Sequence, residues 1–183
     1  MLKSIVADPL DDQEIRHYLP NAKIMTYKEL AKYNGDISKL LPNNKDFAIL
    51  LYEASPMNGH WVAVLRNGDK IEHSDSYGVK PDTELKWIDC GMRQMVGSEV
   101  PLLTNMYDKW IQQGGNVVYN PVAYQQQGSK INTCGRHAIN RINTHMKGYD
   151  LENYKKMMNT LRKQSGLTYD EIVAKKYPIT TDK

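Results

Sequence analysis

The chain has 183 residues, 40% of them hydrophobic and 25% charged, a composition typical of a globular protein rather than a disordered one. Its formal net charge of +3 is too small to indicate a nucleic-acid-binding protein by itself. Its two cysteines lack a Cys-x-x-Cys spacing, which excludes a disulfide framework and a recognisable zinc motif, so we expect no metal and no other cofactor.

The N-terminus gives no sign of secretion. Residues 1–6 are followed at once by Asp8, Asp11 and Asp12, so the long apolar segment of a signal peptide is missing. No apolar run reaches the length that spans a bilayer. We therefore expect a protein of a reducing compartment that is not secreted and does not contact a membrane.

Residues 1–45 are expected to form a helical N-terminal part without site chemistry. Acidic residues in a first turn predict a short helix at 11–15. A second helix over 27–33 would stop at Asn34-Gly35.

Three segments of strand character follow, at 47–52, 60–65 and 70–75. Asn67-Gly68 lies between the second and the third, and Asn-Gly in that position is a strong signal for a two-residue hairpin turn. Counting outward from this turn places His60 directly opposite Asp75. Opposed residues share a face with Cβ atoms roughly 4.5–5.5 Å apart, so the two side chains could hydrogen-bond. A longer loop or a bulge would shift this register.

The rest of the chain is expected to be mainly helical. Apolar residues at helical spacing predict four further helices, at 83–96, 101–111, 151–161 and 168–175. Residues 117–119 and 122–124 have strand character. We expect one domain with three parts: 1–45 at the N-terminus, 46–148 as the catalytic core, and 149–183 as C-terminal helices. The lysines and arginines of the C-terminal third are spaced as on a solvated face rather than in a binding patch.

A glutamine-rich loop at 125–130 leads into an amphipathic helix that begins near Cys134 and stops at Gly148. Asn132 or Thr133 can cap this helix with a side-chain oxygen. The unpaired N–H groups and the dipole of the helix start would stabilise a thiolate on Cys134. The alternative is that Cys134 is a small buried core residue, as free cysteines commonly are.

Three of these side chains form a set that is suited to acyl transfer. Cys134 is a candidate nucleophile, His60 a candidate base, and Asp75 a candidate carboxylate that orients the base. The backbone N–H of Cys134 and a side-chain amide from the glutamine loop are candidate donors to an oxyanion.

Other side chains compete for these roles or have structural explanations. His73 shares a hairpin face with His60 and is the stronger rival base, because a register slip would favour it. His137 lies one helical turn after Cys134, where it points poorly for a substrate between them, and is expected to be structural. Trp61 alternates to the face opposite His60 and is expected in the core. The remaining candidates are expected outside the site: His17 and His145 at the surface, and Cys90 in helix packing.

Four short motifs occur in the order His60-Trp61, Asp75-Ser76-Tyr77-Gly78, Gln127-Gly128 and Cys134-Gly135. Together they resemble the adenovirus maturation protease and its relatives. These include SUMO- and ubiquitin-like-specific cysteine proteases and capsid-maturation proteases of virophages and Polinton-type elements. The family pattern has a glutamine six or seven residues before the nucleophile, and Gln127 is seven residues before Cys134. The resemblance spans residues 60–142.

The resemblance implies an α+β fold with a papain-like cysteine protease core in permuted order. In that fold a small mixed or antiparallel sheet packs against a central helix that starts at the nucleophilic cysteine. Its motifs imply Cys134 as nucleophile, His60 as base, Asp75 as orienting acid, Gln127 as oxyanion donor and Trp61 as packing support. The sequence departs from the pattern at Ser74, where relatives usually have an apolar residue, and Gln125 and Gln126 leave open which glutamine enters the site.

The function implied by the resemblance is a cysteine endopeptidase that processes viral capsid or other virion precursor proteins at glycine-containing motifs. We expect a monomer that acts in the host cytoplasm, at the viral factory, or in the virion. A weak activating nucleic acid or peptide is a further expectation from the same resemblance. Alternatives are a deconjugase for ubiquitin- or SUMO-like proteins, an acetyltransferase of related fold, and a non-catalytic interaction domain.

Overall fold

The computed structural model describes residues 5–56, 58–128 and 130–180. Its five strands are β1 (Lys23–Thr26), β2 (Phe47–Ser55), β3 (Asn58–Asn67), β4 (Lys70–Ser74) and β5 (Asn116–Tyr119). They form one sheet in the order β1-β2-β3-β4-β5. The outer pairs β1–β2 and β4–β5 are parallel, whereas β2–β3 and β3–β4 are antiparallel, so the sheet is mixed.

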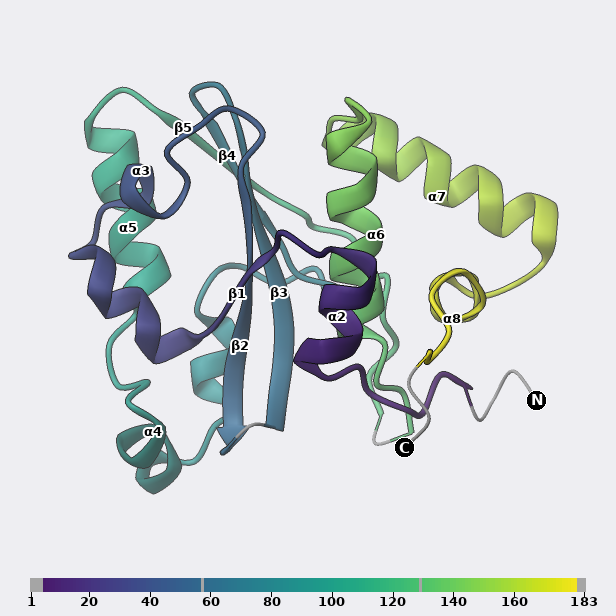
Figure 1. Ribbon diagram of the computed structural model, residues 1–183, viewed down its shortest axis with the longest axis horizontal. Helices are drawn as coiled ribbons and strands as arrows, with labels where there is room; N and C mark the ends of the chain where they lie inside the picture. The colour runs from purple at the N-terminus through teal and green to yellow at the C-terminus, as the bar shows by residue number, and fades with distance from the viewer. Residues whose placement is uncertain (1–4, 57, 129, 181–183) are drawn as a thin grey trace.

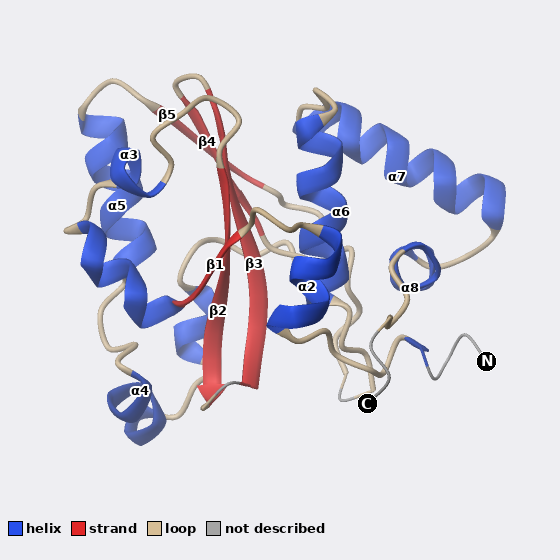
Figure 2. Cartoon of the chain, viewed as in Figure 1, coloured by secondary structure: helices blue, strands red, loops and turns tan. Residues whose placement is uncertain are grey.

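Helices cover both faces of this sheet. They are α2 (Asp12–Tyr18), η1 (Tyr27–Tyr33), α3 (Ile37–Leu40), η2 (Thr83–Lys86), α4 (Cys90–Val96), α5 (Leu102–Gln112), α6 (Cys134–Met146), α7 (Leu151–Ser165) and α8 (Tyr169–Lys176). Figure 1 shows the sheet nearly on edge, with α2, α6, α7 and α8 on one side and α3, α4 and α5 on the other. Figure 2 shows the same three layers coloured by secondary structure.

The central strand β3 is buried on both faces. Trp61, Ala63 and Leu65 point into the core cluster shared with α6, whereas Val62 and Val64 point into the cluster shared with α5. This alternation follows from the period of two along a strand. Continuous apolar sequence is the expected consequence of burial on both faces.

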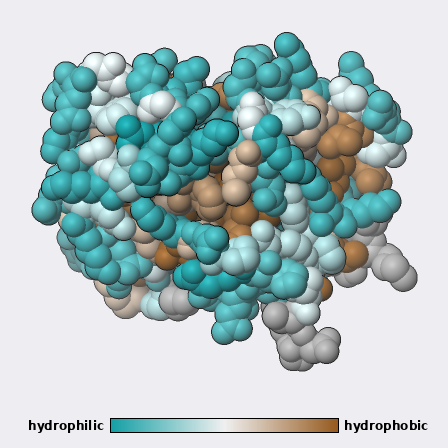
Figure 3. Space-filling model, turned by 45° about the horizontal axis from the view of Figure 1, so that its top comes forward, coloured by the Kyte–Doolittle hydropathy of each residue, from teal (hydrophilic) through white to brown (hydrophobic). Residues whose placement is uncertain are grey.

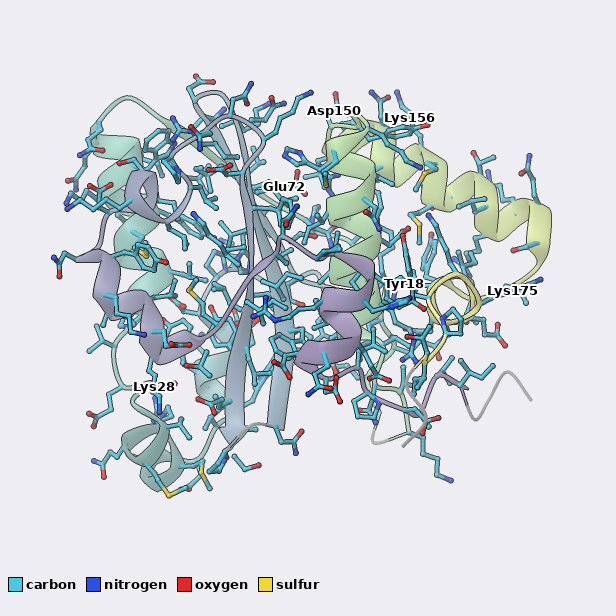
Figure 4. The ribbon with its side chains drawn as sticks, viewed as in Figure 1. Tyr18, Lys28, Glu72, Asp150, Lys156 and Lys175 are labelled. Carbon is cyan, nitrogen blue, oxygen red and sulfur yellow. The ribbon has the colours of Figure 1, made fainter. Side chains whose placement is uncertain are left out.

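An ion pair ties the sheet to α6. Arg141 donates from Nε and Nη2 to the two oxygens of Glu72, each at 2.7 Å. Figure 4 shows Glu72 between the sheet and α6. Both residues are buried, so this two-pronged contact is a well-desolvated, charge-assisted pair.

The face of the molecule seen in Figure 3 is largely polar. Figure 3 shows a mostly hydrophilic face on which hydrophobic residues are visible mainly near the centre and on the right. Among the described residues, no helix combines the length and apolar character needed to cross a bilayer. Lys156 on α7 and Lys175 on α8 lie apart in Figure 4, so these two charges do not belong to one compact patch.

Most expected elements are present, but three expectations are wrong. Residues 1–45 are not all helical, because Lys23–Thr26 forms β1 at the edge of the sheet. The expected helix at 83–96 is two helices, since Asp89 accepts the N–H of Gly91 and begins α4 anew. Residues 122–124 form a loop rather than a strand. The side chain of Asn120 there binds both the N–H and the carbonyl of Val122, replacing the bonds of a ladder.

Candidate active site

The β3–β4 hairpin brings His60 and Asp75 together. His60 Nε2 lies 3.0 Å from Asp75 Oδ1, which is hydrogen-bonding distance. Tyr77 packs flat against the imidazole, with ring centroids 4.5 Å apart and planes inclined by 13°. The ring is therefore held on one face by Tyr77 and at one nitrogen by Asp75.

The contact is made in a different register from the expected one. Asn67 pairs with Lys70, so the turn is Gly68-Asp69 and the expected Asn67-Gly68 loop is wrong. Gly68 has φ +65°, and a glycine with positive φ in the first loop position is typical of a type II′ turn. The pairing of β3 with β4 is therefore shifted by two residues from the expected pairing. Because side chains alternate with a period of two, each residue keeps its face.

The Asp-Ser-x-Gly motif forms a tight turn around the carboxylate. Tyr77 N–H donates to Asp75 Oδ1 at 2.6 Å, and Gly78 N–H donates to the Asp75 carbonyl at 3.1 Å. Gly78 has φ +70°, and a Cβ there would lie 2.6 Å from the carbonyl carbon of Val122. Glycine is therefore required at this position both for the turn and for the close approach of the neighbouring loop.

Cys134 begins α6, as expected, and is buried. The expected capping is wrong, because the Thr133 hydroxyl donates to Asp170 and Asn132 donates to the carbonyl of Ala7. Neither side chain covers the first-turn N–H groups of α6. These groups remain available to the sulfur and to a ligand beside it.

Trp61 and Gly135 build the wall behind the sulfur. The Trp61 indole donates to the carbonyl of Leu10 at 3.1 Å, as a buried indole N–H requires. A Cβ on Gly135 would lie 3.3 Å from both the indole and Leu10, so a larger residue after Cys134 would have to displace these side chains. The N-terminal segment thus borders the site, although no site chemistry was expected there.

Cys134 and His60 line the same cavity, and each shifts the pKa of the other. Burial alone would raise the pKa of the thiol, but the hydrogen bond and charge of His60, with N–H groups of Trp61 and Gly135, hold it below its ordinary value. Burial alone would lower the pKa of His60, but its bonds to Asp75 and Cys134 raise it well above the ordinary value. Opposite shifts of this kind favour a thiolate–imidazolium pair.

The shift of the thiol can be measured through alkylation. Iodoacetamide should label Cys134 at pH values below those at which an ordinary thiol stops reacting, because the thiolate exists above a lowered pKa. In His60→Ala the burial remains but the positive neighbour is lost, so the midpoint should move upward. The rate would be followed against pH by mass spectrometry of the Cys134 peptide, with N-acetylcysteine as reference. An equal midpoint in both proteins would contradict the pairing.

The structure places Gln125, rather than Gln127, beside the cysteine. Gln127 is exposed. Gln125 is buried and lines a cavity of about 260 Å³ together with His60 and Cys134. Ser76 Oγ donates to Gln125 Oε1 at 2.7 Å, which fixes the amide with its nitrogen toward Ile131 O at 3.0 Å. The serine of the Asp-Ser-x-Gly motif is the one sequence signal that could have pointed to this glutamine.

The rival histidines lie in structural positions. His73 is fully buried against the Tyr107 hydroxyl at 3.3 Å, and burial lowers its pKa to about 4, so it is uncharged at neutral pH. His137 binds Asp170 at 3.1 Å. Two expectations are wrong: His145 is buried rather than at the surface, and Cys90 is exposed rather than packed.

Glu84, which sequence reasoning did not single out, lies next to the pair. One ligand-capable atom from each of His60, Asp75 and Glu84 lies within 4.8 Å of the others. Three such atoms could surround a cation. His60 Nε2 and Asp75 Oδ1 already satisfy each other, however, and we do not assign these residues as metal ligands.

Cys134 is reached from two sides. The cavity with Gln125 also borders Tyr77 and Trp87. A second hollow of about 420 Å³ also borders Cys134 and is lined by residues 9–12 and Trp61, and the two hollows meet at Gly59 and Asn132. A polypeptide lying over the sulfur would have room to continue in both directions.

No family model matches the chain. Over 166 residues the chain is 31% identical to "Uncharacterized protein V9" of the Sputnik virophage, covering 90% of this chain and 91% of that one. In structure it is similar to the ASFV pS273R protease, with a TM-score of 0.55, 12% identity, and coverage of 95% of this chain and 69% of that one. It is also similar to the C-terminal Ulp1 protease domain in complex with Smt3, the yeast ortholog of SUMO, with a TM-score of 0.46, 12% identity, and coverage of 95% and 80%. The likeness to pS273R confirms the expected α+β protease fold.

Proposed function

The chain belongs to the family of the Sputnik virophage protein V9, and from the geometry of its site we propose that it is a cysteine endopeptidase. The observation that carries the proposal is the hydrogen-bonded pair of His60 and Asp75 on the cavity that Cys134 borders at the start of α6. The fold of a viral protease and a virophage relative support the expectation that its substrates are capsid or other virion precursors. We accordingly propose that it acts in the infected cell or the virion.

These three side chains supply each step of peptide cleavage. The Cys134 thiolate attacks the scissile carbonyl carbon, and the carbonyl oxygen becomes an oxyanion. The His60 imidazolium then gives its proton to the departing amine, which leaves a thioester on Cys134. His60, now neutral, takes a proton from water as the water attacks the thioester, and the acid product and the thiolate are released. Asp75 holds the ring and stabilises its charged form throughout.

The oxyanion requires donors beside the sulfur. The uncapped N–H groups at the start of α6 are one source. We propose the side-chain amide of Gln125 as the other, because it lines the same cavity as Cys134 and is fixed by Ser76. Its second N–H makes only a long contact of 3.4 Å, with the Tyr77 hydroxyl, which an oxyanion would replace.

Exchanging the two glutamines distinguishes this assignment from the one that motif spacing favours. Gln125→Ala should lower kcat by about 10²–10³-fold, the usual cost of one oxyanion donor. Gln127→Ala is its matched control and should stay near wild type, because that side chain is exposed. Steady-state kinetics on one peptide substrate would measure both. A large loss in Gln127→Ala with none in Gln125→Ala would return the role to Gln127.

Access to Cys134 from both sides supports an endopeptidase over an enzyme that takes only a chain end.

The proposed endopeptidase activity is tested by incubating the protein with virion precursor proteins encoded alongside this chain, with ubiquitin- or SUMO-like fusions, and with acetyl-CoA. Cys134→Ala serves as the blank. Internal cleavage of the precursors, located by N-terminal sequencing, is the expected result. Cleavage of the fusions alone would make the protein a deconjugase, and acetyl-CoA turnover alone would make it a transferase. Adding DNA to the same reactions tests for an activating nucleic acid.

A further inference from the structure

A second carboxyl group lies behind the His60–Asp75 pair. Glu84 on η2 is 2% exposed and Asp75 is 0% exposed, so neither group reaches bulk water. Asp75 Oδ1 is engaged by His60 and by the N–H of Tyr77. Asp75 Oδ2 and both oxygens of Glu84 receive no hydrogen bond from a donor elsewhere in the described part of the chain.

Oxygen atoms of Asp75 and Glu84 lie within 4.8 Å of each other. Two carboxylates this close in the protein interior cannot both stay ionised. Each loses its hydration and repels the other. Every unpaired buried acceptor adds a further cost. A single proton between the two groups removes these costs, because it converts one acceptor into a donor. Asp75 already carries the bonds that stabilise a negative charge, so the proton belongs on Glu84.

We infer that Glu84 is a protonated positioning residue whose O–H donates to Asp75 Oδ2 and holds that carboxylate in place for His60. The role deepens the proposed function and rests on it. Glu84 also borders the cavity that His60 and Cys134 line, but in this role it acts on the ring through Asp75.

The direction of the shifts agrees with this placement. Burial, followed by the hydrogen bond to Asp75 and the negative charge of Asp75, raises the pKa of Glu84 to about 10. Burial would raise the pKa of Asp75 too, but the bonds from His60 and Glu84 hold it well below its ordinary value. The proton is thus kept by one member of the pair across the neutral range.

The positive charge of His60 favours the ionised form of Glu84, but burial and the neighbouring Asp75 outweigh it. Tyr52 on β2 and Tyr107 on α5 are buried phenols whose pKa burial raises well above the ordinary value, so both are neutral. Asp82, which precedes η2, accepts from the Tyr52 hydroxyl at 2.8 Å. Burial keeps His73 uncharged. These neutral and negative groups favour retention of the proton by Glu84.

A hydrogen bond from Glu84 would fix the orientation of the Asp75 carboxylate and, through it, of the His60 ring. With Oδ2 held by Glu84 and Oδ1 facing His60 Nε2, the carboxylate has one preferred rotation. The ring is thereby fixed with its other nitrogen available to Cys134. A carboxylate free to rotate would hold the imidazole in this geometry for a smaller fraction of the time.

Two variants of similar size separate positioning from packing. Glu84→Gln keeps a donor toward Asp75, whereas Glu84→Met keeps the bulk and cannot donate. We expect Glu84→Met to lower kcat about tenfold with KM unchanged, and Glu84→Gln to stay within about threefold of wild type. Thermal unfolding of each variant would establish the folded fraction used to calculate kcat. Wild-type kcat in folded Glu84→Met would overturn the positioning role.

The shared proton is tested without substrate. An infrared spectrum of the wild type in D2O at neutral pH, recorded with EDTA so that a cation cannot replace the proton, should contain a protonated-carboxyl C=O stretch. Glu84→Gln should lack this band. A wild-type spectrum without it would overturn the inference whether or not the protein cleaves peptides. The band in a protein without peptidase activity would uphold the proton and remove only the proposed function.

Discussion

Replacing Cys134 with alanine should lower kcat for peptide cleavage by roughly 10⁵–10⁶-fold, because the variant has no atom that can form the thioester. The substrate should still bind, since its contacts with both hollows remain, and a dissociation constant near wild type is expected. Single-turnover cleavage and equilibrium binding of the same fluorescent peptide would measure the two effects separately.

The chain contains its own control for this variant. Cys90→Ala removes the exposed cysteine at the start of α4 and should leave kcat unchanged. A loss of activity in Cys90→Ala equal to that in Cys134→Ala, or less than a hundredfold loss in Cys134→Ala, would contradict the assignment of the nucleophile.

Asp75→Asn should lower kcat by about 10⁴-fold, the cost seen when the acid of such a triad becomes an amide. Asparagine fits the same space, but its NH2 group can turn toward His60 and favour the wrong tautomer. It also cannot stabilise the imidazolium that forms beside Cys134. Because the thiolate depends on that positive charge, alkylation of Cys134 at neutral pH should slow as well.

Asp69→Asn makes the same chemical change at the exposed turn of the same hairpin and is the matched control. Both variants should fold, which circular dichroism would show. If Asp69→Asn and Asp75→Asn lost activity alike, the effect would belong to the hairpin rather than to the carboxylate at His60.

The set of Cys134, His60 and Asp75 could be anticipated from sequence because its members are marked by local chemistry. Cys134 follows a loop and starts a helix, and His60 and Asp75 lie on two strands joined by a short turn. The turn itself was misplaced by one residue, because Gly68 can occupy either loop position. The error did not separate the pair, since the resulting shift of two residues preserves the face of each side chain.

Expectation and structure differ where packing between distant segments decides the outcome. Strand β1 has only four residues, too few for alternation to be read, and it forms because the edge of β2 is open to it. Motif spacing favours Gln127 whereas the structure favours Gln125, because spacing along the chain does not show which amide Ser76 can reach. No sequence pattern around Glu84 indicated a place in the site. A lone acid in a polar segment reads as a surface residue, and only the fold buries it beside Asp75.

The two hollows that meet at Cys134 suggest a route to selective inhibition. A thiol-reactive compound that fills one hollow would depend largely on the reactivity of its warhead, which many cysteine enzymes share. A longer compound that spans the sulfur could stack on Trp87 at one end and contact residues 9–12 at the other. Joining the two ends makes the second binding event intramolecular, so affinity would increase without a more reactive group.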